Sequence, residues 1–127
     1  MSASHESYEN QSARFWIENG ILFFEYKPNT AIDLQVAIQV VADRIAFQNE
    51  RLLPVFCDTR GIISIDKAAR DYLAKSGSLL AKAVALLGTE NVSMTMSTFY
   101  LEISKPSVPT RVFSIEQEAL DYLNGFL

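Results

Sequence analysis

The 127-residue sequence has few of the side chains on which most catalytic and metal sites depend. It contains one histidine, His5, and one cysteine, Cys57, so it offers no histidine pair, no CxxC motif and no Ser-His-Asp or Cys-His group. The glycine-rich phosphate loops GxxxxGKS/T and GxGxxG are also absent. We therefore expect a non-enzymatic protein with no catalytic residue, no metal ligand and no cofactor.

Basic residues are scarce as well, since 11 Lys and Arg face 15 Asp and Glu, for a net charge of −4. The sequence has no run of Lys and Arg, which is what phosphate backbones and anionic membrane surfaces attract. No uninterrupted apolar run approaches the ~18 residues of a membrane span. We expect neither nucleic acid nor a membrane among the partners.

Residues 1–12 are mostly polar, and we expect a disordered tail there, followed by a single α/β domain over residues 13–127. The N-terminal residues lack the basic start and apolar stretch of a secretory signal. Cys57 lies in an apolar run, so we expect a small core residue without a disulfide partner. A reducing cytoplasm is the expected compartment.

A hairpin is the strongest local signal that the sequence does contain. Asn19-Gly20 joins the β-prone runs 14–18 and 21–26, and Asn-Gly favours the tight type I′ turn of a two-residue loop. That loop fixes the register, so that Trp16 and Phe23 lie opposite each other on the face that also carries the charged pair Arg14 and Glu25. The opposite face is the predicted core face, with Phe15, Ile17, Leu22 and Phe24.

The rest of the chain alternates between helical and strand patterns. The further predicted elements are a helix from the capping box Thr30–Asp33, strand 53–58, connector 59–64, helix 64–76, strand 82–88, helix 89–104, strand 111–114, and a helix from a second capping box at Ser114 to about Gly125. The order β-β-α-β-α-β-α-β-α predicts an α/β domain. Its five-stranded sheet is mainly parallel, with the antiparallel N-terminal hairpin at the edge.

The first predicted helix carries more apolar surface than one sheet contact requires. One stripe comprises Leu34, Ala37, Ile38, Val41 and Ile45, and a second comprises Val36, Val40 and Phe47. Together with one tryptophan, five tyrosines and eight phenylalanines, this width would suit an apolar cavity between the first helix and the sheet.

A polar segment follows the buried strand 53–58. In open α/β sheets, ligands and partners bind at the carboxyl ends of strands, so we interpret this segment as a partner-binding loop. Its residues are Asp58, Thr59, Arg60, Ser64, Asp66 and Lys67. The alternative is purely local: Ser64 or Asp66 caps the next helix, Asp66 pairs with Arg70, and Arg60 is solvated.

The aromatic pair Trp16 and Phe23 is the second candidate surface, because both side chains are apolar on the more polar face of the hairpin. Clustered exposed apolar side chains usually mark an interface. We expect Trp16 and Phe23 to form an apolar interface, either in a homodimer or with a regulatory protein partner.

The segment after strand 53–58 resembles the motif of STAS domains, the bacterial anti-sigma-factor antagonists with a SpoIIAA-like fold. There the strand is followed roughly by D-L-S-G-V-x-x-I/M-D-S-S-G-L. The positions that match are Asp58, Gly61, Ile62, Ile65 and Asp66. The ending PTRVFSIEQEALDYL is similar to the last strand and helix of small uncharacterised bacterial proteins of this fold, so the resemblance covers about residues 13–126.

One departure from this motif limits what the resemblance implies. STAS antagonists switch by phosphorylation of the serine that follows the second aspartate, but here Lys67 and Ala68 follow Asp66. Ser64 lies nearby but not at the matching position. The resemblance thus implies a protein-interaction domain without the phosphoacceptor, and the apolar pair Trp16 and Phe23 adds the expectation that this domain self-associates. The alternatives are a protein that binds a small apolar, lipid-like ligand and, as a third class, an enzyme.

Overall fold

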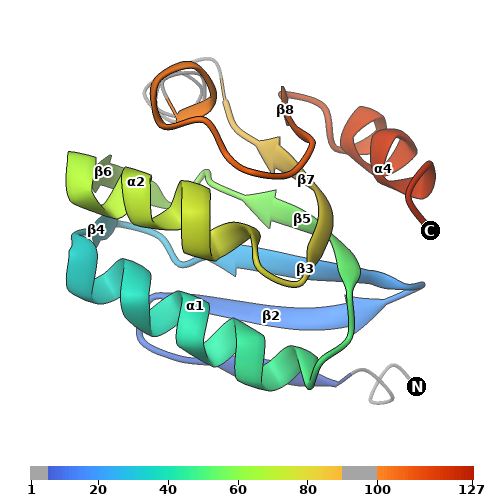
Figure 1. The fold of residues 1–127 in the computed structure, drawn as a ribbon, viewed down its shortest axis with the longest axis horizontal. Coiled ribbons are helices and arrows are strands. Elements are labelled where there is room, and N and C mark those ends of the chain that lie inside the picture. The colour runs from blue at the N-terminus through green and yellow to red at the C-terminus, as the bar shows by residue number, and fades with distance from the viewer. Residues whose placement is uncertain (1–5, 90–99) are drawn as a thin grey trace.

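The structure is a computed structural model that describes residues 6–89 and 100–127, apart from the side chain of Glu102. Its centre is a six-stranded mixed sheet with the order β1-β2-β3-β5-β7-β8 (Figure 1). The strands are β1 Ser7–Glu9, β2 Ala13–Glu18, β3 Ile21–Tyr26, β5 Leu53–Asp58, β7 Ala81–Leu87 and β8 Thr110–Phe113. The β1–β2 and β2–β3 pairs are antiparallel, whereas β3–β5, β5–β7 and β7–β8 are parallel. The predicted mainly parallel α/β domain with an antiparallel N-terminal edge is confirmed.

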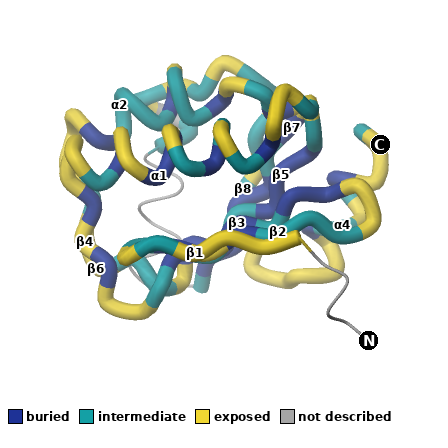
Figure 2. Tube along the Cα trace, turned by 90° about the horizontal axis from the view of Figure 1, so that it is seen from below, coloured by how far each residue is buried: buried dark blue, intermediate teal, exposed yellow. Residues whose placement is uncertain are grey.

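Helices cover both faces of this sheet, which therefore has two apolar cores. Helices α1 (Leu34–Gln48) and α2 (Lys67–Lys75) lie side by side on one face, and α4 (Glu116–Asn124) lies on the other (Figure 1). The first core packs residues such as Phe15, Leu22 and Val40, and the second packs residues such as Phe56 and Leu123. In Figure 2 the buried positions of α1 and α2 face the sheet. None of the helices in the described part of the chain combines the length and apolarity needed to cross a membrane.

The hairpin forms with the predicted turn and register. Asn19 and Gly20 have φ angles of 52° and 79°, as a type I′ turn requires. Arg14 lies opposite Glu25, and its Nε is 2.6 Å from the Glu25 Oε1. Local turn chemistry was sufficient to set this register because a two-residue loop leaves the strands no freedom to slide.

The predicted tail over residues 1–12 is wrong from Ser7 onward, because residues 7–9 form β1 on the edge of the sheet. Residues 1–5 lie outside the described part. Asn10 makes the turn between β1 and β2, since its Oδ1 accepts hydrogen bonds from the backbone N–H groups of Ser12 (2.8 Å) and Ala13 (2.9 Å). Pairing with β2 orders a segment that has little apolar content of its own.

A second, two-stranded sheet replaces two features predicted from the sequence. Residues Thr30–Ile32, expected to begin the first helix, form β4, and the connector after β5 contains β6, Ile62–Ile65. The Thr30 hydroxyl donates to the Lys27 carbonyl (2.7 Å) instead of capping a helix. Asp33 caps α1 by accepting a hydrogen bond from the Val36 N–H at 2.9 Å. Pairing between segments far apart in the sequence thus overrides the local cap signal.

The remaining boundaries differ by a few residues. Helix α2 begins at Lys67 rather than near Ser64, with Asp66 as its N-cap. Helix α4 has Ile115 as its N-cap, without a side-chain hydrogen bond, so the predicted capping box at Ser114 does not form. Most of the helix predicted over 89–104 lies outside the described residues, and its described end, Tyr100–Ser104, is a π-helix (η3).

The buried face of helix α1 overlaps the predicted stripes only in part. Its buried residues are Ala37, Val40, Val41, Arg44 and Gln48, of which the first three belong to those stripes. Leu34 and Ile38, also placed in a stripe, are exposed. The buried face therefore includes an arginine, which helps to shape the candidate site.

Candidate functional site

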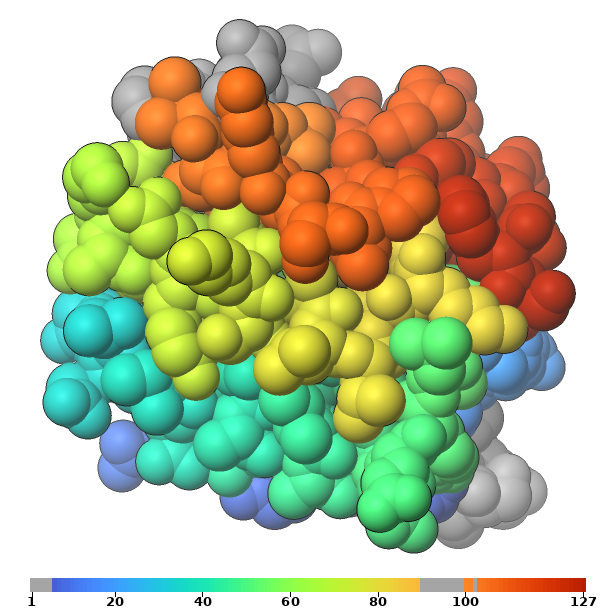
Figure 3. Space-filling model, in the orientation of Figure 1, coloured from blue at the N-terminus to red at the C-terminus, as the bar shows by residue number. Residues whose placement is uncertain are grey.

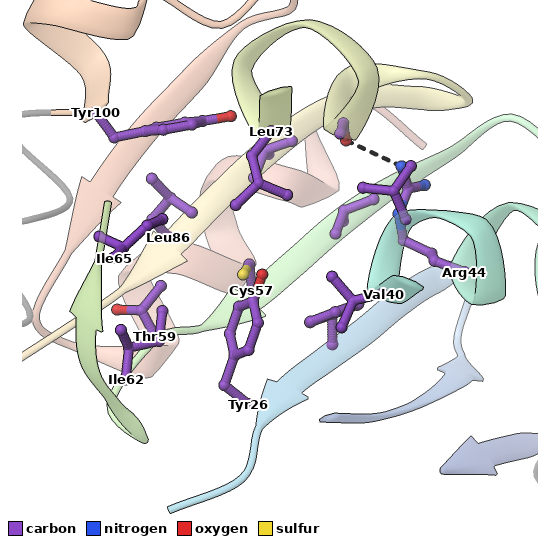
Figure 4. Close-up of a pocket in the computed structure, with 15 residues that line it drawn as sticks. Tyr26, Val40, Arg44, Cys57, Thr59, Ile62, Ile65, Leu73, Leu86 and Tyr100 are labelled. Carbon is purple, nitrogen blue, oxygen red and sulfur yellow. Dashed lines mark hydrogen bonds between the residues drawn. The ribbon is translucent and has the colours of Figure 1, made fainter. Parts of the chain in front are cut away.

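The principal site is a cavity of about 100 Å³ between the helices α1 and α2 and the sheet, here called the helix-side cavity. Apolar side chains from β3, β5, β7, α1 and α2 make up most of its wall, as Figure 4 shows. Among the described residues, its polar lining consists of Tyr26, Arg44, Cys57, Thr59 and Tyr100 and includes no aspartate or glutamate. The cavity lies between α1 and the sheet. From the sequence, a pocket is expected at this place if the protein binds a small apolar ligand.

Arg44 reaches the helix-side cavity from α1 and is only 4% exposed. Its Nη2 donates hydrogen bonds to the carbonyls of Gly77 (2.9 Å) and Leu79 (3.0 Å), and its Nη1 donates to the Gln48 Oε1. Gln48 in turn donates from Nε2 to the carbonyls of Arg51 and Leu80, both at 2.8 Å. These bonds tie the end of α1 to the chain that follows α2.

Tyr26, at the end of β3, extends its hydroxyl into the helix-side cavity beside the sulfur of Cys57 (Figure 4). Its ring packs edge-on against Phe24, with the centroids 4.9 Å apart. Burial raises the pKa of the Tyr26 phenol well above its ordinary value, and it raises the pKa of Cys57 to about 12. Both groups are therefore neutral at physiological pH, and Cys57 is not a reactive thiolate.

Tyr100, in η3, forms the far end of the same cavity (Figure 4). Burial also raises the pKa of its phenol. Thr59, at the base of the cavity, donates from its hydroxyl to the Leu87 carbonyl at 2.8 Å. The polar groups that the cavity offers a ligand are thus a buried guanidinium and neutral hydroxyl and thiol groups.

Sequence reasoning did not identify Arg44, Tyr26 or Tyr100. A signal for Arg44 is present, since it lies at i+3 and i+4 from Val41 and Val40 and thus on the same helix face. No comparable signal marks Tyr26, because its position on the core side of β3 is equally typical of a structural aromatic residue.

The predicted partner-binding loop does not form one cluster. Asp58 accepts hydrogen bonds from the Arg60 Nε (2.9 Å) and Nη2 (2.7 Å), and Thr59 is buried. Ser64 is exposed in β6, Asp66 caps α2, and the Lys67 Nζ lies 2.7 Å from the Asp71 Oδ2. Most of these side chains therefore have local structural roles.

A groove of about 440 Å³ on the other face of the sheet, here called the α4-side groove, brings the two predicted sites together. Trp16 and Phe23 line it with Asp58 and Arg60, whereas Ser64, Asp66 and Lys67 do not. The Trp16 and Phe23 rings stack with their centroids 5.5 Å apart and their planes at 4°. Both side chains are half-buried, and β2 and β3 carry them beside α4.

The described residues contain no group of three or more His, Cys, Asp or Glu side chains placed to hold a metal ion. The cavity and the groove present apolar surface, hydrogen-bonding groups and charge.

Comparisons with known proteins agree with the fold. An uncharacterised protein of the DUF3478 family from Shewanella loihica PV-4, with a SpoIIAA-like fold, is 15% identical and superposes with a TM-score of 0.56, covering 94% of this chain and 92% of that chain. No curated protein sequence matches the chain. The family model described as a domain of unknown function, DUF7793, matches residues 15–127. The chain therefore belongs to the DUF7793 family and has a SpoIIAA-like fold.

Proposed function

We propose that this protein is a non-enzymatic binding protein that holds a small apolar molecule in the helix-side cavity. The observation that carries the proposal is the cavity itself, about 100 Å³ with a mostly apolar wall in the middle of the helix-covered core. Protein interiors are close-packed and rarely leave voids larger than a water molecule. A mostly apolar recess of this size in the core is therefore suited to holding an apolar molecule.

The energetic argument concerns the apolar wall of the helix-side cavity. A ligand that covers this wall removes apolar surface from water, which contributes roughly 25 cal/mol per Å². For scale, an apolar cavity of about 150 Å³ binds benzene.

Titration with toluene tests this proposal directly. In ¹H–¹⁵N NMR spectra, we expect saturable shifts for residues on β3, β5 and α2 that border the helix-side cavity. The Val84→Phe variant, which adds volume at a lining position, should abolish these shifts while keeping a folded spectrum. Tyr122→Phe, on α4 across the sheet, is the matched control and should bind toluene as the original protein does. Absence of saturable shifts in the original protein would refute the proposal.

Protein binding at the α4-side groove is the second candidate function. The observation that favours it is the half-exposed stack of Trp16 and Phe23 next to the Asp58–Arg60 ion pair. An aromatic stack rimmed by charges is typical of protein interfaces. The partner in this second proposal includes another copy of the same chain, bound through the groove. We also propose the cytoplasm as the compartment, because a single cysteine without a disulfide partner fits a reducing environment.

A further inference from the structure

The charge of Arg44 is not explained by the contacts that it makes. It forms no ion pair with any carboxylate that the structure describes, although it is only 4% exposed. Its hydrogen-bond partners are neutral: two backbone carbonyls and the Gln48 amide. Buried arginines are ordinarily paired with an acid, because neutral acceptors satisfy N–H groups without neutralising the charge.

The guanidinium of Arg44 also has donor capacity left over. Of its five N–H groups, three are engaged by Gln48, Gly77 and Leu79, which leaves Nε–H and one Nη1–H without an acceptor in the described part of the chain. Since Arg44 lines the helix-side cavity, a ligand there lies beside an unneutralised positive charge.

Tyr26 supplies an independent second observation. The side chain is only 6% exposed, and its hydroxyl lies in the helix-side cavity, where it has no hydrogen bond to any described residue. A phenylalanine would pack against Phe24 equally well. The hydroxyl is thus a hydrogen-bond donor that faces the cavity and is available to a ligand there.

Taken together, the described part of the cavity wall provides hydrogen-bond donors and positive charge. Its described lining contains Arg44, the two phenols Tyr26 and Tyr100, and no carboxylate. Burial raises the pKa of both phenols, so each remains a neutral hydrogen-bond donor. This set is complementary to an anion that accepts hydrogen bonds, and the apolar remainder of the wall is complementary to a hydrocarbon body.

We infer that the helix-side cavity selects a small apolar carboxylic acid, whose carboxylate pairs with Arg44 and accepts a hydrogen bond from the Tyr26 hydroxyl. The inference rests on the proposed function and adds the chemical class of the ligand. The volume of about 100 Å³ limits the hydrocarbon part to roughly one ring or a short chain.

Paired titrations with toluene and benzoate at neutral pH test the inference. The two probes share a ring and differ in one substituent, so their ratio of dissociation constants isolates the carboxylate. We expect benzoate to bind at least tenfold more tightly than toluene. If toluene binds and benzoate binds no more tightly, the inference is overturned while the proposed function stands. If neither probe binds, both are overturned.

Two variants then assign the preference to the named side chains. Tyr26→Phe removes only the hydroxyl and should weaken benzoate binding about fivefold without changing toluene binding. Arg44→Met removes the charge and should abolish the preference for benzoate, with toluene binding as the check that the cavity persists. Tyr122→Phe is the matched control and should change neither affinity. Benzoate binding that survives both Tyr26→Phe and Arg44→Met would overturn the inference, and Tyr26→Phe alone decides the matter if Arg44→Met does not fold.

Discussion

Individual side chains of the helix-side cavity have ionisation properties that follow from where the fold buries them. Cys57 is an example: its sequence context indicated a core residue, and the structure places its thiol inside the cavity beside Tyr26 (Figure 4). Burial disfavours the thiolate and raises the pKa of Cys57 to about 12 from the ordinary 9.0. A group with this shift makes stability depend on pH in the alkaline range.

The first prediction concerns that dependence. Above pH 9 the unfolded chain releases the Cys57 proton, while the folded chain retains it until about pH 12. The contribution of Cys57 to the free energy of unfolding is therefore complete below pH 9 and is lost as the pH rises. The free energy of unfolding should therefore fall between pH 9 and 10.5, with a Cys57 contribution of about 1.4 kcal/mol per pH unit. Urea unfolding of the original protein and of Cys57→Ala measures it. Equal alkaline slopes for the two proteins would contradict the prediction.

At the scale of elements, one glycine fixes how the turn after β5 passes the end of β3. A Cβ atom on Gly61 would lie 2.3 Å from the Lys27 carbonyl oxygen and 2.5 Å from the Tyr26 carbonyl oxygen. The backbone N–H of Thr30 donates to the Gly61 carbonyl at 3.0 Å, so this contact also joins β4 to β6. The glycine that matched the STAS motif in the sequence thus has a steric role here.

Gly61→Ala should therefore destabilise the protein. Neither carbonyl can move without breaking the strand ends, so we expect a loss of about 2 kcal/mol or more, measured by thermal or urea unfolding. Gly125→Ala is the matched control, because its Cβ would lie no closer than 3.4 Å to another atom at the end of α4. That control should change stability by less than about 1 kcal/mol. Similar stabilities for both variants would argue against the steric role of Gly61.

Other elements show where local patterns succeed and where they are overridden. The hairpin and the bounds of β5 follow from the sequence, since Asn19-Gly20 and the apolar run 53–58 are local signals. The start of α1 does not, because pairing of β4 with β6 takes Thr30 out of the helix and leaves Asp33 as the cap. The capping-box pattern spans only four residues of sequence. The strand that pairs with Thr30–Ile32 instead, β6, lies about thirty residues further along the chain, so the local pattern does not reveal it.

Considered as a whole, the molecule has the helix-side cavity and the α4-side groove on opposite faces of its sheet. In Figure 3 the surfaces of α1 and α2 meet side by side and the segment before β8 borders α2, so this face is continuous over the helix-covered core. The opposite face carries α4 and the α4-side groove, where Trp16 and Phe23 are half-buried. Ligand binding and protein binding would therefore occur on opposite sides of one sheet.

The last prediction tests the protein-binding side. If the α4-side groove holds a homodimer, Trp16→Ser combined with Phe23→Ser should halve the mass measured by light scattering, because the stacked rings are the central apolar contact. Leu52→Ser combined with Leu79→Ser is the matched control, since both leucines are exposed elsewhere. Circular dichroism checks that each variant folds. A monomeric original protein, or a double variant that remains dimeric, would rule out this interface.

By itself, the sequence determined the fold class and the hairpin with its register, because these depend on turn chemistry and on periodicity within one element. The sequence also indicated four residues of the α4-side groove, but in two separate predicted sites: Trp16 and Phe23 in one, Asp58 and Arg60 in the other. The tertiary structure alone decided that Arg44, Tyr26 and Tyr100 surround one cavity. These residues lie on α1, β3 and η3, and only the packing of helices on a sheet determines which side chains from distant elements face one another and which gap remains between them.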